Sequence, residues 1–139
     1  MIFLTRAVTR AARRPLVVGD LPFGTYEVSD EQAVASAIRM VKEGGADVVK
    51  LEGAGRMLSR VRAIADSNIG IMGHVGLTPQ SAIKLGGFRA QGRTADAAVA
   101  LYESALALQD AGLEYEVAVP GDRQGVGHLE APKRIRRKV

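Results

Sequence analysis

Short apolar runs alternate with helix-length segments along most of this chain, and this alternation constrains its fold more than any other feature. The strand-like runs cover residues 16–20, 47–51, 69–73 and 115–119, and the first three are mostly aliphatic. Continuous aliphatic runs are typical of parallel strands that are covered on both faces. Helix-length connections between them predict an α/β fold with parallel strands and right-handed crossovers.

The helical segments carry recognisable beginnings and ends. Ser29-Asp-Glu-Gln32 is a capping box, in which Ser29 accepts from the third helical N–H group and Gln32 reaches back. Gly44-Gly45 ends this helix, and Thr94 caps a later helix that stops at Gly112. The apolar positions of the three helices are predicted to be Ala33, Ala37, Ile38 and Val41, then Met57, Leu58, Val61, Ile64 and Ala65, then Val99, Leu101, Leu106 and Leu108.

Two architectures fit the alternation. One is a small doubly wound sheet, and the other is part of a TIM-type (β/α)8 barrel, which typically needs about 250 residues. Periodicity does not choose between them. The composition changes near Pro120, so residues 1–120 are predicted to form the domain and residues 121–139 an atypical basic tail.

The charge and composition exclude several classes of protein. The net charge is +4, and five positive charges come from a terminal cluster, so the chain without this cluster is near −1; the cluster is Lys133, Arg134, Arg136, Arg137 and Lys138. With three Tyr and three Phe there is no basic-aromatic surface for stacking bases, so we expect no nucleic-acid partner. No apolar run approaches the roughly 20 residues that cross a bilayer, so we expect no membrane partner. The absence of cysteine excludes thiolate metal sites and is compatible with the cytoplasmic location that we expect.

Four segments place polar or ionisable groups at or just past the ends of strand-like runs. They are Asp20-Leu-Pro-Phe-Gly24, Lys50-Leu-Glu-Gly53, Met72-Gly-His-Val-Gly-Leu-Thr-Pro-Gln-Ser81 and Leu85-Gly-Gly-Phe-Arg-Ala-Gln-Gly-Arg93. The carboxyl ends of parallel strands meet at one edge of a sheet, where α/β proteins bind ligands. The sequence therefore predicts that these segments converge on one site.

Asp20, Lys50 and Glu52 carry the charges that matter most. Asp20 is suited to a hard cation such as Mg²⁺, which uses few carboxylates and leaves positions for substrate oxygens, or else it caps a turn. Lys50 and Glu52 are two residues apart in a strand, so strict alternation puts both side chains on the same face. Lys50 can then hold a substrate carboxylate while Glu52 supports a metal or a proton transfer. A salt-bridged pair at a strand end is the alternative.

His74 is the more informative of the two histidines. It suits hydrogen bonding or proton shuttling, with Gly73 and Gly76 leaving room for a ligand, whereas a structural histidine is the alternative. The segment 78–81 indicates a loop that turns into a short helix, whose polar groups either face a ligand or cap the helix. Arg89 stands among glycines and suggests an anion-binding loop that matches no established phosphate motif.

In this order and spacing, the four segments closely resemble the ketopantoate hydroxymethyltransferase family, also called 3-methyl-2-oxobutanoate hydroxymethyltransferase. The resemblance covers about residues 1–112. It implies a (β/α)8 barrel, of which about half is present here, and a homo-oligomer. It also implies transfer of a hydroxymethyl group from 5,10-methylenetetrahydrofolate to 3-methyl-2-oxobutanoate, with Mg²⁺, in the first committed step of pantothenate synthesis.

The resemblance also implies a role for each matched residue. Asp20 is similar to one of the family's two aspartates at the metal and keto-acid site, and Lys50 to the lysine that contacts the keto acid. Glu52 is similar to the acidic residue near the metal, and His74 to an active-site histidine. A divalent ion chelated by the substrate's 2-oxo and carboxylate oxygens would acidify the C3–H bond by stabilising an enolate. We therefore expect catalytic roles for His74 and Glu52, substrate binding by Asp20 and Lys50, and metal binding by Asp20 and Glu52.

The chain departs from the family pattern in two places. The family's other metal aspartate, in an upstream Gly-Asp-Ser-Leu-Gly segment, has no counterpart, and neither Glu114 nor Glu116 aligns without a gap with its catalytic glutamate. We expect a truncated or divergent member. The alternative is an inactive family fragment that acts as a binding or oligomerisation module. Other Mg²⁺-dependent barrel enzymes that act on 2-oxo acids are not expected to carry the Leu-Thr-Pro-Gln and Gly-Phe-Arg-Ala-Gln-Gly-Arg sequences.

Overall fold

Helices and strands alternate along the chain, as the sequence predicts. The structure, a computed structural model, describes residues 1–81, 90–113 and 115–119, the last as backbone only. The elements are α1 (Ile2–Ala11), β1 (Val18–Asp20), α2 (Asp30–Lys42), β2 (Val48–Glu52), the 3-10 turn η1 (Gly55–Met57), α3 (Leu58–Asp66), β3 (Gly70–Gly76), the 3-10 turn η2 (Pro79–Ser81), α4 (Ala95–Asp110) and β4 (Tyr115–Val119). None of the described helices is long and apolar enough to span a membrane. The predicted tail over 121–139 and the glycine-rich loop around Arg89 lie outside the described residues.

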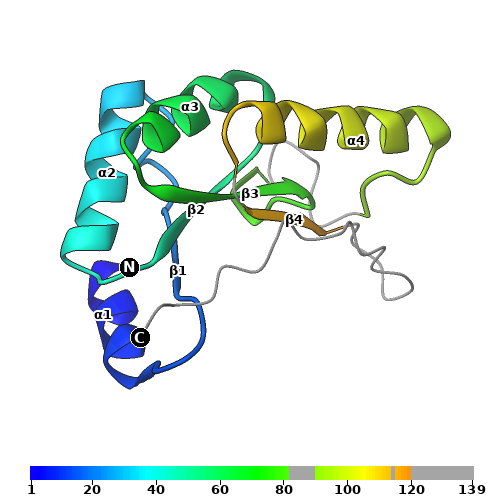
Figure 1. The fold of residues 1–139 in the computed structure, drawn as a ribbon. Coiled ribbons are helices and arrows are strands. Elements are labelled where there is room, and N and C mark those ends of the chain that lie inside the picture. Colours follow the sequence, from blue (N-terminus) through cyan, green and yellow to red (C-terminus); the bar gives the residue numbers. More distant parts are fainter. Residues whose placement is uncertain (82–89, 114, 120–139) are drawn as a thin grey trace.

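The four strands form one parallel sheet in the order β1-β2-β3-β4. Each strand pairs with the next one along the chain, so successive right-handed crossovers place their helices on the same face. A doubly wound sheet reverses its order and carries helices on both faces. Figure 1 shows α2, α3 and α4 along one side of the sheet. The strand order therefore decides between the two predicted architectures: the chain forms consecutive (β/α) units of a TIM-type barrel.

The core lies between the sheet and these helices. Its fully buried side chains come from both layers and include Ala33, Ala37, Val49, Leu51, Val61, Ile64, Ile71 and Leu108. Gly19 sits where β1 meets α2, and a Cβ atom there would lie 2.4 Å from the Cγ atom of Met40. Only glycine permits this approach. Gly19, Leu51 and Gly73 thus face the helices, which leaves the alternate residues of each strand on the opposite face.

The predicted helix caps are present with one adjustment. Ser29 accepts from the N–H group of Gln32 at 3.1 Å, and Thr94 accepts from that of Ala97 at 3.2 Å. The side chain of Gln32 reaches back one residue further than predicted, because its Oε1 accepts from the N–H group of Val28 at 3.1 Å. α2 ends at Lys42 before the two glycines, as expected.

The buried faces of two helices and the ends of two strands differ from the prediction. Ile38 is 46% exposed, and Met40 takes its place in the core, because a helix turns about 100° per residue and Ile38 lies beyond the buried stripe. Val99 and Leu106 of α4 are also exposed. β1 is shorter than predicted, whereas β3 continues to Gly76 because its last residues, Val75 and Gly76, pair with β4.

Candidate active site

The register of the sheet brings the predicted site residues together. Asp20 lies beside Lys50 across β1 and β2, and Glu52 lies beside His74 across β2 and β3. Laterally paired residues of neighbouring strands point to the same face, and so do residues two apart on one strand. The four side chains therefore share the face that points away from the helices, at the carboxyl ends of the strands. His74 belongs to β3 itself rather than to the loop after it.

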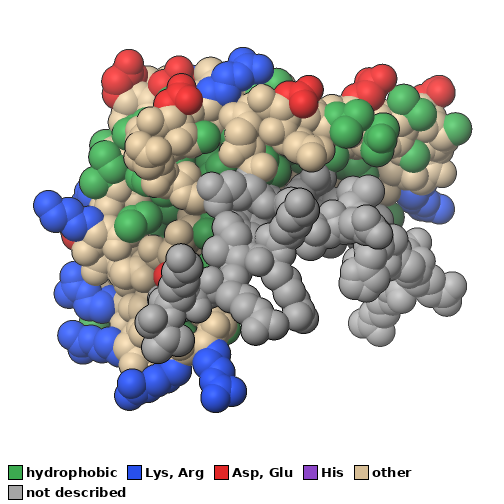
Figure 2. Space-filling model, viewed as in Figure 1, with side chains coloured by type: hydrophobic (Ala, Val, Ile, Leu, Met, Phe, Trp, Pro, Cys, Tyr) green, Lys and Arg blue, Asp and Glu red, His purple; other side chains and the backbone are tan. Residues whose placement is uncertain are grey.

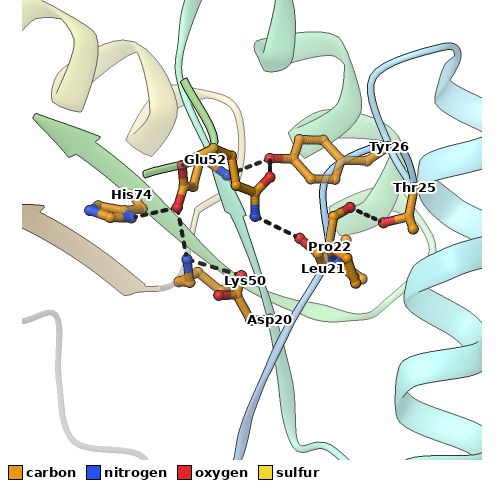
Figure 3. A network of polar contacts seen from close by, with 9 residues as sticks. Asp20, Leu21, Pro22, Thr25, Tyr26, Lys50, Glu52 and His74 are labelled. Carbon is orange, nitrogen blue, oxygen red and sulfur yellow. Dashed lines mark hydrogen bonds and ion pairs between the residues drawn. The ribbon is translucent and has the colours of Figure 1, made fainter. Parts of the chain in front are cut away.

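Lys50 lies between two carboxylates. Its Nζ atom is 3.0 Å from Oδ1 of Asp20 and 3.6 Å from Oε1 of Glu52 (Figure 3). The side chain of Glu52 is only 4% exposed and that of Asp20 is 41% exposed. A buried carboxylate is costly unless a positive charge compensates it, and Lys50 provides that charge. The salt bridge considered as an alternative is therefore real, and it holds the site residues together.

Both oxygens of Glu52 have neighbours, whereas one oxygen of Asp20 lacks a hydrogen bond. Oε2 of Glu52 accepts from the backbone N–H group of Gln80 at 2.9 Å. Its Oε1 lies near Lys50 and 3.4 Å from Nδ1 of His74. Within the described part of the chain, Oδ1 of Asp20 is buried and makes no hydrogen bond, so the ammonium group of Lys50 is its partner.

His74 is held in its neutral form. Burial lowers the pKa of His74 below the usual 6.5, the positive charge of Lys50 lowers it further, and Glu52 opposes both effects. Its two ring nitrogens are buried and have no hydrogen-bond partner among the described residues. Because Nδ1 faces the carboxylate of Glu52, the proton is favoured on Nδ1. Nε2 is then an acceptor that a ligand can use.

Tyr26 and Gln80 contact the site residues, although no role was predicted for Tyr26. The hydroxyl group of Tyr26 donates to Oε1 of Gln80 at 2.6 Å and accepts from the N–H group of Glu52 at 3.3 Å. Burial raises the pKa of Tyr26 to about 12, so the hydroxyl group keeps its proton at neutral pH. The one feature of the sequence that could have indicated a role for Tyr26 is its hydroxyl group, which stands in the loop after a strand.

The donor atoms suit a hard cation. Within the described ranges no group of three or more His, Cys, Asp or Glu side chains is arranged to hold a metal ion. Mg²⁺ needs only one or two carboxylates and completes its shell with water and substrate oxygens. Asp20 fits this role better, because its side chain is 41% exposed, although its Oδ1 pairs with Lys50. Glu52 is less suited as a direct ligand, because both of its oxygens already have partners.

Acidic and basic side chains at the carboxyl ends of consecutive (β/α) units define the class of TIM-type barrel enzymes. Comparison with known proteins identifies one family within this class. The family model described as ketopantoate hydroxymethyltransferase matches residues 1–118, and the chain belongs to this family. The resemblance seen in the four sequence segments is thereby confirmed.

Several curated relatives carry the corresponding enzyme name. The chain is 60% identical over 108 residues to 3-methyl-2-oxobutanoate hydroxymethyltransferase 1, mitochondrial, of Oryza sativa subsp. japonica, a match that covers 77% of this chain and 30% of that protein. It is 55% identical over 113 residues to the mitochondrial enzyme 1 of Arabidopsis thaliana, covering 81% and 33%. It is also 55% identical over 113 residues to the enzyme of Thermobifida fusca (strain YX), covering 81% and 40%. The chain thus spans 30–40% of the length of these relatives.

Proposed function

We propose that this chain supplies part of an active site that transfers a hydroxymethyl group from 5,10-methylenetetrahydrofolate to 3-methyl-2-oxobutanoate, giving 2-dehydropantoate. Family membership supports the reaction, since the relatives are named as 3-methyl-2-oxobutanoate hydroxymethyltransferases. The observation that carries the proposal is the cluster of Asp20, Lys50, Glu52 and His74 on one face at the carboxyl ends of β1, β2 and β3.

Lys50 would bind the keto acid, and His74 would face it. The ammonium group of Lys50 already contacts the carboxylate of Asp20, and a substrate carboxylate can take the same kind of contact. His74 has a ring nitrogen, Nε2, that no described residue uses, so this nitrogen can face the substrate and accept a proton from it. Substrate and site would then exchange one ion pair for another, which limits the cost of removing charges from water.

Asp20 would hold Mg²⁺, with Glu52 beside it. When bound, the ion would act as a Lewis acid on the 2-oxo group and make the C3–H bond more acidic. His74 is neutral and lies 3.4 Å from Glu52, so this pair is the proton acceptor that the described residues offer. The carbanion equivalent at C3 would then bond to the methylene carbon of the folate. Both C–N bonds to that carbon would break, water would supply the hydroxyl oxygen of the product, and the two folate nitrogens would take up the remaining protons.

Proton NMR of 3-methyl-2-oxobutanoate in deuterated buffer tests the proposal. Loss of the C3–H signal is followed with the protein, with and without Mg²⁺, and with the His74→Gln variant. We expect metal-dependent exchange above the protein-free rate, lowered about 100-fold or more in the variant, which is the usual contribution of general-base catalysis. If a sample shown to be folded by circular dichroism gives no exchange, this chain does not perform the enolisation step.

That negative result would favour the second candidate, an inactive member that acts as a binding or oligomerisation module. The observation behind it is that the chain spans only 30–40% of its relatives. A homo-oligomer and a cytoplasmic location complete the proposal. Both plant relatives described above bear the word mitochondrial in their names, so subcellular fractionation is the measurement that tests the location.

A further inference from the structure

One chain of hydrogen bonds connects the last residue of β2 with the segments that follow β1 and β3. The side chain of Gln80 lies at its centre. Its Oε1 accepts from the hydroxyl group of Tyr26 at 2.6 Å, and its Nε2 donates to the carbonyl oxygen of Leu21 at 3.1 Å. Its backbone N–H group donates to Oε2 of Glu52 at 2.9 Å. Three segments far apart in the sequence therefore meet at one residue.

The chemistry of each partner fixes the direction of these bonds. The carbonyl oxygen of Leu21 can only accept, so the amide nitrogen of Gln80 must face it and the amide oxygen must face Tyr26. The hydroxyl group of Tyr26 donates its one proton to Gln80 and accepts from the N–H group of Glu52. Glutamine supplies both a donor and an acceptor here, which neither glutamate nor leucine can do.

The backbone of Tyr26 is itself anchored from the helix layer. Arg60 of α3 donates to the carbonyl oxygens of Tyr26 and Glu27, each at 3.2 Å, and forms an ion pair with Asp30. The ring of Tyr26 is 2% exposed. The hydroxyl group is thus held at a fixed point, from which it places the side chain of Gln80.

We propose that Tyr26 and Gln80 are positioning residues, which hold the carboxylate of Glu52 in line with Lys50 and His74. The inference rests on the proposed function, because it assigns the pair a purpose in that reaction. Neither residue need contact the keto acid. Tyr26 orients Gln80, Gln80 binds Oε2 of Glu52, and Oε1 of Glu52 then remains directed at the two groups that would meet the substrate.

Hydrogen exchange of the backbone N–H group of Gln80, followed by NMR, tests the positioning without any need for catalysis. In Tyr26→Phe we expect this amide to exchange about tenfold faster, as loss of one supporting hydrogen bond implies. The Gly53 amide, which donates to the carbonyl oxygen of His74 at 2.9 Å, reports on the neighbouring strands and should keep its rate. Tyr102→Phe, at an exposed tyrosine of α4, is the matched control and should change neither amide.

An unchanged Gln80 amide in Tyr26→Phe would overturn the inference. So would an equal acceleration of both amides, since that pattern means a loss of overall stability rather than a loss of local positioning. Gln80→Ala keeps the backbone N–H group but removes the side chain that anchors it to Tyr26 and Leu21. The backbone amide of residue 80 should therefore exchange faster in this variant while the fold, followed by circular dichroism, is kept, and an unchanged rate would overturn the inference.

The kinetic counterpart uses C3–H exchange of 3-methyl-2-oxobutanoate. Tyr26→Phe and Gln80→Ala should lower kcat about tenfold and leave KM within about twofold, because they act through Glu52 rather than on substrate binding. Gln109→Ala, at an exposed position of α4, is the control for Gln80→Ala. A raised KM with unchanged kcat would overturn the positioning role. If the unaltered chain gives no exchange, the proposed function fails, and the amide measurements still decide whether Tyr26 and Gln80 hold Glu52.

Discussion

Asp20 and Lys50 form the ion pair nearest to solvent in the site, and this makes Asp20 the residue whose replacement is most informative. Asp20→Asn replaces the carboxylate with an amide of nearly the same size and removes its negative charge. We expect Mg²⁺-linked binding of 3-methyl-2-oxobutanoate, measured by calorimetry, to fall by at least tenfold. Asp66→Asn removes the same charge at an exposed position on α3 and should leave binding unchanged. Equal binding by the unaltered chain, Asp20→Asn and Asp66→Asn would show that Asp20 does not hold the metal.

His74 links the stability of the chain to pH. Its pKa in the folded protein lies below the ordinary 6.5, chiefly because the ring is buried. Below pH 6.5 the unfolded chain therefore binds a proton that the folded chain resists, so the free energy of unfolding decreases as the pH falls from about 7 to about 5. Urea unfolding at the two pH values measures this decrease, and in His74→Gln it should be smaller. The same decrease in both proteins would show that other groups cause it.

Tyr26 should be visible in an alkaline titration. Burial raises its pKa to about 12, whereas the unfolded value is 10.0. Between these two values the unfolded chain loses a proton that the folded chain keeps, so stability falls as the pH rises through this range. Absorbance at about 295 nm should show one late tyrosinate transition that Tyr26→Phe removes. A variant that retains this transition would assign it to another tyrosine.

The charged site residues could be predicted from the sequence, whereas their supports could not. Lys50 and Glu52 are two apart on a strand, and strand alternation alone places both on one face. Tyr26 and Gln80 are 54 residues apart, and their hydrogen bond depends on how two loops pack. No local pattern carries that information. The neighbours of His74 were likewise fixed only by the register between β2 and β3.

At the scale of the element, the Ser29 cap is the clearest test of why α2 begins where it does. Ser29→Ala removes the acceptor of the Gln32 N–H group and should cost about 1 kcal/mol of stability. Ser104→Ala is the control, because this serine lies inside α4 and bonds back to the carbonyl oxygen of Ala100. Alanine is a better helix former there, so stability should not fall. Chemical denaturation measures both, and a matching loss in the two variants would refute the cap.

Caps and breakers are local signals, and for this reason they were predicted well. Thr94 and Gly112 bracket α4 as expected. The buried stripes were less predictable, because apolar spacing does not say how much of a helix the sheet covers. Val99 and Leu106 fit a helical period, yet both are exposed. The length of β3 also depends on a tertiary effect, since pairing with β4 extends it to Gly76.

At the scale of the whole molecule, α4 carries apolar side chains that nothing described covers. Val99, Tyr102 and Leu106 are exposed, and Figure 2 shows apolar side chains gathered along this helix at the right of the view. Among the described residues, β1 pairs only with β2 and β4 only with β3. Exposed apolar surface and sheet edges favour association.

We therefore expect the sedimentation coefficient of the chain to rise with concentration. Val99→Lys combined with Leu106→Lys should weaken this rise, because it replaces apolar surface with charge. Glu103→Lys, at an exposed position of the same helix, changes the net charge by the same two units and keeps the apolar side chains. It serves as the control. An equal effect of both changes would show that charge, rather than apolar surface, governs the association.

The order of the strands also bears on how the chain acquires its fold during synthesis. Val18 pairs with Val48, Val48 with Gly70, and Met72 with Tyr115, so every partner is the next strand to leave the ribosome. No strand has to wait for a distant one. Neighbouring contacts close short loops and form early. A nascent chain can therefore complete Asp20, Lys50, Glu52 and His74 as a cluster once β3 has emerged, before α4 has left the ribosome.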